Sequence, residues 1–102
     1  MAESATKTLR LIVDEGVSQQ WKDILAFYTE RNGSDHYSTN LNEKLQKKLE
    51  FLCHSPKMGQ KTKRKGIRRQ IVAGRFAVFY RIKKDAIEVV AIVDARRNVP
   101  LD

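Results

Sequence analysis

The sequence predicts an α+β fold, in which an antiparallel helical hairpin packs on a three- to four-stranded, mainly antiparallel sheet. Apolar residues recur at helical spacing across residues 17–28 and again across residues 37–52. Three runs rich in β-branched and aromatic residues follow between residues 67 and 93. With 102 residues, the chain is long enough for one domain spanning 1–102. We expect the small, polar residues 1–7 to be disordered.

The first elements are a short strand and a helix. The β-branched run Leu9–Val13 predicts the N-terminal strand. Ser18 is expected to cap a helix that runs to about Arg31, because its hydroxyl can accept hydrogen bonds from the first-turn N–H groups. Gly33 suits the left-handed position that ends such a helix. The apolar stripe of this helix is Val17, Trp21, Ile24, Leu25 and Tyr28.

A second helix is predicted from a cap at Ser34 or Asp35 to about Cys53, where Pro56 stops it. The connection between the helices is short, so they are expected to pack as an antiparallel hairpin. The apolar stripe of the second helix is Tyr37, Leu41, Leu45, Leu49 and Leu52. The charged residues expected to face water are Lys44, Lys47, Lys48 and Glu50.

Three strands are predicted after a basic loop, at residues 67–72, 75–82 and 86–93. Gly74 supplies the positive φ that a tight hairpin between the first two requires. The third strand contains a continuous apolar run, Val89–Val93, which predicts a central strand covered on both faces. Tyr80 lies in an alternating strand. Such a tyrosine is typical of the core, and stacking on a base is the alternative.

The positive charge is concentrated in the second half of the chain. The net charge is +8; residues 1–52 carry 7 Lys/Arg against 8 Asp/Glu, whereas residues 53–102 carry 13 against 4. Such a surface attracts polyanions or acidic proteins. The single cysteine, Cys53, excludes an internal disulfide, and no apolar run is long enough to span a membrane. We therefore expect a cytoplasmic protein without a membrane segment.

No metal or cofactor site is predicted. His36 and His54 are not joined by other ligands at metal-binding spacing. The sequence also lacks a phosphate-binding glycine loop, a nucleophile elbow and a dinucleotide fingerprint. We therefore expect the protein to use no cofactor.

The order of motifs resembles the RelE/ParE superfamily of toxins from type II toxin–antitoxin modules. The resemblance covers nearly the whole chain. It rests on WKDI with FY in the first helix, on the L-x-x-x-P-x-x-G signature of residues 52–59, and on GIR, FAVFYRI and DARR in the sheet. The resemblance implies a helical hairpin against a curved sheet, and a cognate acidic antitoxin wrapped around the toxin. The family's targets are the ribosome with its mRNA and DNA gyrase.

Cleavage of RNA needs a base, an acid and stabilisation of the phosphorane charge. The candidates for a catalytic role are Arg68, Arg69, Arg75, Arg96, Arg97 and Lys65. Arg68 matches the arginine of the family's first sheet strand, but the second family arginine is replaced by Ala77. The tyrosine or histidine that the endonuclease branch often carries near its C-terminus is also missing. Both departures count against enzymatic activity, although a lysine of depressed pKa could still act.

Residues 61–69 hold six basic residues in nine, with no acidic residue among them. We expect this segment to contact phosphate or an acidic antitoxin, whereas the basic residues of the 81–84 turn are expected to be solvated edge charges. The predicted target- or antitoxin-binding residues are Lys61, Lys63, Arg64, Lys65, Arg68, Arg69, Tyr80, Arg96 and Arg97. The sequence favours a ParE-like gyrase inhibitor. The alternatives are a RelE-like ribosome-dependent mRNA endonuclease and a degenerate toxin that binds nucleic acid.

Overall fold

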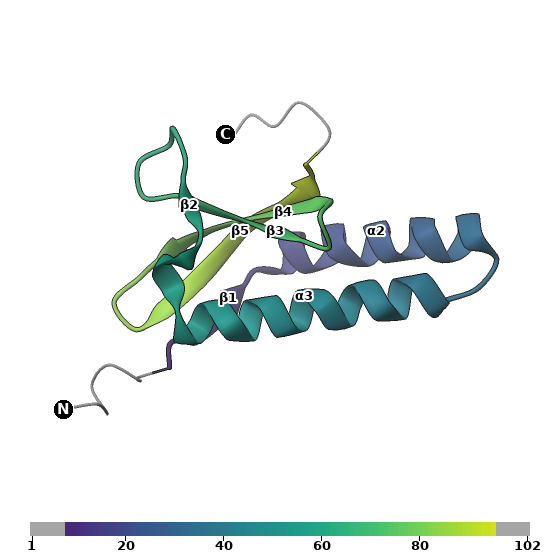
Figure 1. Ribbon diagram of the computed structural model, residues 1–102, viewed down its shortest axis with the longest axis horizontal. Helices are drawn as coiled ribbons and strands as arrows, with labels where there is room; N and C mark the ends of the chain where they lie inside the picture. Colours follow the sequence, from purple (N-terminus) through teal and green to yellow (C-terminus); the bar gives the residue numbers. More distant parts are fainter. Residues whose placement is uncertain (1–7, 96–102) are drawn as a thin grey trace.

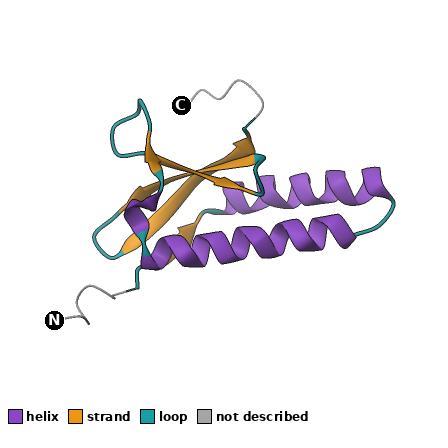
Figure 2. Ribbon diagram, in the orientation of Figure 1, coloured by secondary structure: helices purple, strands orange, loops and turns teal. Residues whose placement is uncertain are grey.

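The computed structural model describes residues 8–95 and places two long helices on one face of a five-stranded sheet (Figures 1 and 2). Neighbouring strands follow the order β1-β5-β4-β3-β2, and only β1 and β5 run parallel. The hairpin extends beyond the sheet at its closed end. The elements are Arg10–Val13 (β1), Glu15–Asn32 (α2), His36–His54 (α3), the 3-10 helix Pro56–Met58 (η1), Gln60–Lys61 (β2), Arg68–Val72 (β3), Phe76–Ile82 (β4) and Ala86–Asp94 (β5).

Helix α2 begins earlier than predicted, because Asp14 rather than Ser18 is its cap. The Asp14 carboxylate accepts hydrogen bonds from the N–H groups of Gly16 and Val17, which are free at the start of a helix. Gly33 ends the helix in the left-handed conformation, at φ 70°, as predicted. Helix α3 has Asp35, one of the two predicted residues, at its cap position, but the Asp35 side chain makes no capping hydrogen bond.

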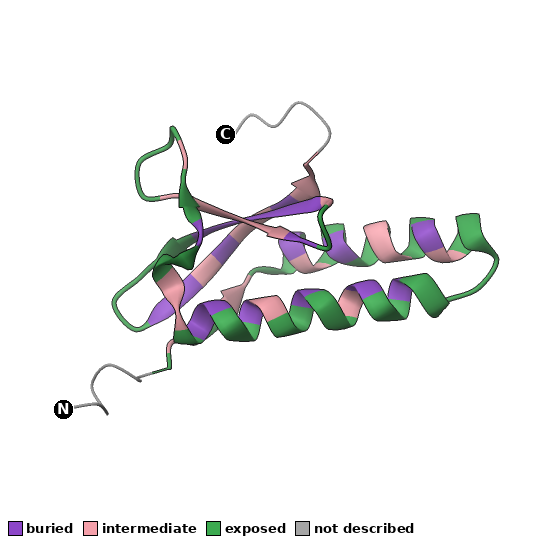
Figure 3. Ribbon diagram, in the orientation of Figure 1, coloured by how far each residue is buried: buried purple, intermediate pink, exposed green. Residues whose placement is uncertain are grey.

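The core lies between the helical hairpin and the sheet (Figure 3). Trp21 and Tyr28 of α2 are buried, and both meet the Phe76 ring of β4 edge-on, with Trp21 at 5.6 Å between centroids. The indole N–H of Trp21 donates to the Asn42 side chain at 2.9 Å, which satisfies its polar atom. The predicted stripes are therefore confirmed as core, except at Tyr37, which is exposed. Their buried members are Val17, Trp21, Tyr28, Leu41, Leu45, Leu49 and Leu52.

The strand buried on both faces is β4, so this part of the prediction for Val89–Val93 is wrong. Residues 76–80 are all buried, whereas Val90, Ala91 and Val93 are half-exposed. The register explains the difference: Tyr80 pairs with Val89 and its neighbour Phe79 with Ala91, so Val90 is an extra residue in β5. Because of this bulge, Val89 and Ile92 both lie on the face of the sheet that packs against the helices. Val90 has no paired residue in β4.

Candidate functional site

A basic surface lies at the end of the sheet that carries β2. We call it the β2–β3 basic surface and define it by Lys61, Lys63, Arg64, Lys65 and Arg68. Two open cavities, of about 310 and 550 Å³, lie beside it and share Arg64 and Lys65 in their linings. Ile67 also lines both cavities, so an apolar side chain lies among the cations of this surface.

The loop that carries these cations is held by one threonine. The Thr62 hydroxyl donates to the Ile67 carbonyl at 2.9 Å and accepts from the Arg64 N–H at 3.1 Å. The backbone N–H of Thr62 donates to the same carbonyl at 3.1 Å. Gly66, at φ 83°, allows the chain to turn back into β3. The side chains of residues 63–65 are exposed as a consequence.

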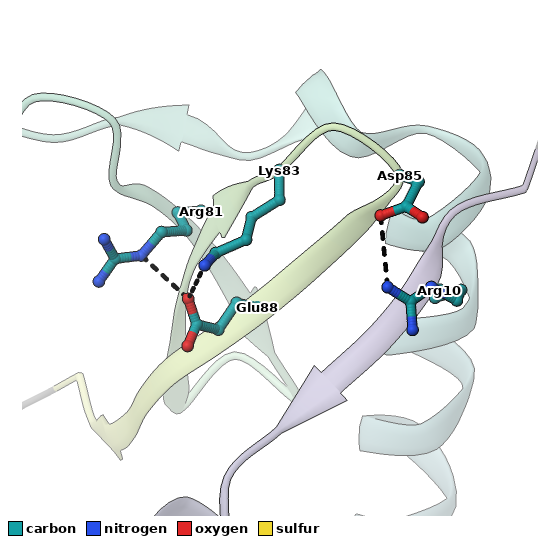
Figure 4. Close-up of polar contacts among 5 residues, drawn as sticks. All are labelled: Arg10, Arg81, Lys83, Asp85 and Glu88. Carbon is teal, nitrogen blue, oxygen red and sulfur yellow. Dashed lines mark hydrogen bonds and ion pairs between the residues drawn. The ribbon is translucent and has the colours of Figure 1, made fainter.

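Carboxylates pair with two cations of the neighbouring turn, Arg81 and Lys83, but with none of the loop cations. Glu88 pairs with Arg81 at 3.3 Å and with Lys83 at 3.5 Å (Figure 4). Asp85 pairs with Arg10 at 3.4 Å. Within residues 8–95, the ion pairs include none from the four cations at 61, 63, 64 and 65. The loop cations are therefore available to an external anion. Arg81 and Lys83 instead have a carboxylate partner, although the sequence analysis expected them to be solvated edge charges.

Arg68 is bound to the backbone of the turn that precedes β2. Its Nη1 atom donates to the Gly59 carbonyl at 2.8 Å and to the Lys57 carbonyl at 3.1 Å. Both carbonyls lie in the segment between α3 and β2. Arg68 therefore joins β3 to the 57–59 turn, and part of its donor capacity is used within the protein.

Tyr80 is completely buried and does not reach the surface, so the prediction that it contacts a target or antitoxin directly is corrected. Its hydroxyl donates to the Pro56 carbonyl at 2.6 Å and accepts from the Gly59 N–H at 2.9 Å. Burial raises the pKa of this hydroxyl, while the hydrogen bond from Gly59 and the charge of Arg68 oppose that rise. The interpretation of Tyr80 as a core residue is confirmed by its 0% exposure.

The L-x-x-x-P-x-x-G signature now has a structural explanation. Leu52 is fully buried against Tyr80 and Ile87. Pro56 opens η1, where its missing N–H costs nothing. A Cβ at Gly59 would lie 2.4 Å from the Tyr80 hydroxyl oxygen, so only glycine fits without displacement. The signature therefore fixes the turn from which the β2–β3 basic surface extends.

The candidate catalytic residues are not gathered in one place. Arg75 lies before β4, at the opposite end of that strand from Tyr80, which pairs with Arg68. Tyr80 lies four residues along the strand from Phe76, which corresponds to about 13 Å. The guanidinium of Arg75 stacks 4.9 Å from the Tyr28 ring centroid, and its Nε lies 3.8 Å from Asp94. Arg75 therefore packs against the helical hairpin, on the Tyr28 ring, and lies away from Arg68.

The remaining predicted residues divide by position. Arg69 pairs with Phe79 on the sheet face opposite to Tyr80 and is half-buried. Lys65 is exposed in the loop. Arg96 and Arg97 lie outside the described residues. The arrangement places positive charge at one end of the sheet. The titratable hydroxyl beside Arg68 is that of Tyr80, which is buried and has a raised pKa.

A second cationic surface, which the sequence analysis missed, lies where α3 passes the β3–β4 turn. We call it the α3 lysine surface; its cavity measures about 310 Å³. The lysines were expected only to face water. Their spacing of i, i+3 and i+4, followed by an exposed Phe51 at i+7, was the signal that places them on one side of the helix. The lining residues are Lys44, Lys47, Lys48, Phe51, Val72 and Ala73.

No group of three or more histidine, cysteine or carboxylate side chains capable of holding a metal occurs within residues 8–95. Cys53 is buried, and burial raises the pKa of its thiol. In the same part of the chain, neither helix is both long and apolar enough to cross a membrane.

Comparisons with known proteins agree with this architecture. The model of the family described as "ParE toxin of type II toxin-antitoxin system, parDE" matches residues 11–99. A solved structure of a chromosomal ParDE toxin–antitoxin system from P. aeruginosa superimposes with a TM-score of 0.75. The sequences share 14% identity, and the match covers 86% of this chain and 97% of the other. A search of curated proteins found no match.

Proposed function

The chain belongs to the ParE toxin family of type II toxin–antitoxin systems, and we propose that it inhibits growth in the cytoplasm by binding DNA gyrase. In this proposal the protein is not an enzyme and needs no cofactor. A cognate acidic antitoxin neutralises it by covering the β2–β3 basic surface.

One observation carries the choice of a binding mechanism over RNA cleavage. Arg68, which occupies the family's arginine position, donates to the carbonyls of Lys57 and Gly59. The adjacent Tyr80 hydroxyl is fully buried and has a raised pKa. A general base must reach its proton and have a pKa near the working pH, and this tyrosine meets neither condition. The arrangement supports holding an anionic partner rather than moving protons.

The charge on the loop supports the antitoxin part of the proposal. The cations Lys61, Arg64 and Lys65 line open cavities and have no carboxylate partner within residues 8–95. Cations of this kind accelerate the encounter with an acidic protein. An antitoxin that covers them also covers Arg68, which lines the same cavity.

A RelE-like, ribosome-dependent mRNA endonuclease is the second candidate. The observation that favours it is the same unpaired cationic loop, because phosphate groups suit such a surface as well as carboxylates do. In that case Lys65 or Arg68 would stabilise charge on the cleaved phosphate. A degenerate toxin that only binds nucleic acid is the remaining alternative, and unaffected growth after induced expression would favour it.

Two assays distinguish the candidates. Purified protein is added to gyrase with relaxed plasmid, and separately to ribosomes translating a reporter mRNA. We expect supercoiling to stop and the mRNA to stay intact. Cleavage of the mRNA that is lost in Lys65→Ala or Arg68→Ala, but kept in Lys22→Ala, would replace the proposal with the endonuclease. Lys22 is an exposed cation of α2 and serves as the matched control.

A further inference from the structure

The cavity of the α3 lysine surface is lined by three lysines and by apolar side chains, and no carboxylate lines it. Glu43 and Glu50, the exposed acidic residues of α3, lie outside the lining. The ion pairs among residues 8–95 include none from Lys44, Lys47 or Lys48. The three ammonium groups are therefore open to an external anion.

Phe51 places an exposed aromatic ring among these cations. It is 41% exposed, and the Lys48 ammonium lies 5.6 Å from its ring centroid. Proteins bind single-stranded nucleic acids with this combination, because a base stacks on the ring while the phosphates contact the cations. From Lys44 to Lys48 the helix rises about 6 Å, which corresponds to roughly two nucleotide steps of about 3.4 Å.

The β3–β4 turn, which completes the lining, has a strained backbone at Ala73. Its φ of 57° lies in the left-handed region, which is unfavourable for a residue with a Cβ. Among residues 8–95, it is the only residue other than glycine with a positive φ. Asparagine adopts this conformation more readily but has a larger side chain. Strained backbone is concentrated at functional sites, and here it accompanies a small residue in the lining of a cavity.

We propose that the α3 lysine surface binds a single-stranded nucleic acid, with one base stacked on Phe51 and the neighbouring phosphates on the lysines. The cavity of about 310 Å³ is at the lower end of the size range of small-molecule sites, so it admits a single base. Its lining shares no residue with the cavities of the β2–β3 basic surface, which the proposed function assigns to the antitoxin.

The composition of the lining favours a single strand over other anionic partners. An acidic peptide offers carboxylates to the lysines but no base for the ring, and a duplex keeps its bases stacked inside. No side chain of the lining is an acceptor that could read a base edge or a 2′-hydroxyl. We therefore expect little sequence preference and similar affinities for DNA and RNA strands.

The test uses the full chain and a fluorescein-labelled oligothymidylate of about eight nucleotides, a length typical of single-strand sites. Binding is measured by fluorescence anisotropy over a series of salt concentrations. Replacing Lys44, Lys47 and Lys48 with serine should weaken binding about tenfold or more at low salt. It should also reduce the slope of log affinity against log salt by about 2, at roughly 0.7 per phosphate contact.

The matched charge control replaces Lys22, Arg31 and Lys84 with serine, which removes the same charge from other exposed positions. This control should change the affinity by less than about threefold, because the general attraction of a basic protein for a polyanion depends only weakly on three distant charges. Equal losses of affinity in the two triple variants would overturn the proposal.

Phe51→Leu tests the stacked base, because it removes the ring and keeps an apolar side chain. Binding should weaken about fivefold or more, since stacking on an aromatic ring is lost. Phe27→Leu is the matched control: Phe27 is 54% exposed and also lies beside a cation, with Arg31 at 6.0 Å from its ring centroid. This control should change the affinity less than about twofold, and equal effects of the two changes would contradict the stacking.

Ala73→Asn separates binding from folding. Asparagine relieves the strain of the turn and adds atoms at a residue that lines the cavity, so we expect weaker binding at an equal or higher urea midpoint. Unchanged binding would exclude the cavity as the site.

Competing partners complete the test. Tighter binding of an octaglutamate peptide, of a duplex of the same length or of anionic lipid vesicles would overturn the proposal. An oligouridylate should bind within about twofold of the oligothymidylate, and a tenfold preference for either would contradict a lining that does not read the 2′-hydroxyl. These measurements use neither gyrase nor ribosomes, so their failure leaves gyrase inhibition to be judged by supercoiling.

Discussion

The Tyr80 hydroxyl joins the middle of the sheet to the end of the helical hairpin, because it accepts a hydrogen bond from the Gly59 N–H at 2.9 Å. It also donates to the Pro56 carbonyl at 2.6 Å. Arg68 adds two hydrogen bonds to the same turn from the neighbouring strand. The position of the β2–β3 basic surface therefore depends on a buried tyrosine that makes no contact with solvent.

Replacing Tyr80 with phenylalanine tests this connection. The change leaves the Pro56 carbonyl and the Gly59 N–H without their partner, so we expect the free energy of unfolding to fall by about 1–3 kcal/mol. Urea denaturation measures it. The control is Tyr37→Phe, whose hydroxyl makes no hydrogen bond to the described residues; that change should stay within about 0.5 kcal/mol. Equal losses for the two variants would contradict the account.

Gly59→Ala tests the close approach of the turn to the tyrosine ring. The added Cβ would lie 2.4 Å from the hydroxyl oxygen and 2.8 Å from a ring carbon, so the turn or the ring must move. We expect a loss of about 1–3 kcal/mol in the free energy of unfolding, near the upper end because the clash involves both the hydroxyl and the ring. Gly74→Ala, which meets no atom within 4 Å but has φ at 65°, should cost about 1–2 kcal/mol. A smaller loss for Gly59→Ala than for Gly74→Ala would be inconsistent with this packing.

The raised pKa of Tyr80 predicts a loss of stability in alkali. Burial raises the pKa above its usual 10.0, so between the unfolded and folded pKa values the unfolded chain has released the proton and the folded chain retains it. Stability therefore falls as pH rises above 10, and this contribution is complete below that value. Urea midpoints of wild type and Tyr80→Phe between pH 9 and 11 measure it. The wild type should lose more stability than the variant, and parallel curves would refute the assignment.

The exposed loop predicts a salt-dependent association rate. Replacing Lys63, Arg64 and Lys65 with serine should slow binding of the cognate antitoxin by about tenfold at low salt, because electrostatic steering acts on the encounter. The difference should shrink as salt reduces the screening length to about 3 Å at 1 M. Stopped-flow mixing measures the rate. A triple change at Lys22, Arg31 and Lys84 removes the same charge elsewhere and should have a much smaller effect. An unchanged rate in the loop variant at low salt would place the antitoxin on another surface.

The spacing of apolar residues predicted the architecture well, because the apolar positions of the helices and strands are mostly those that become buried. The sequence located both helices and the strands around Leu9–Val13 and residues 67–94 to within a few residues. It missed β2, since Gln60–Lys61 are two exposed polar residues whose pairing depends on β3 alone. The bulge at Val90 could not be predicted from the sequence either, because an extra apolar residue does not interrupt the apolar run Val89–Val93.

The site was less predictable, because charge in a sequence does not reveal hydrogen-bond partners. The sequence singled out Arg68 through the family motif, but its two carbonyl partners follow only from the fold. Tyr80 was predicted both as a typical core residue and as a binding residue, and its packing against Leu52 decides for the core. The α3 lysine surface required knowing that α3 passes beside Val72.

We propose that this toxin acts by binding gyrase and not by cutting RNA. The most direct measurement places the same preparation of protein in a gyrase supercoiling assay and in a reconstituted translation reaction with labelled mRNA. We expect dose-dependent loss of supercoiling, with full-length mRNA at every dose. Undisturbed supercoiling, together with ribosome-dependent fragments that disappear in Arg68→Ala at matched stability, would contradict it.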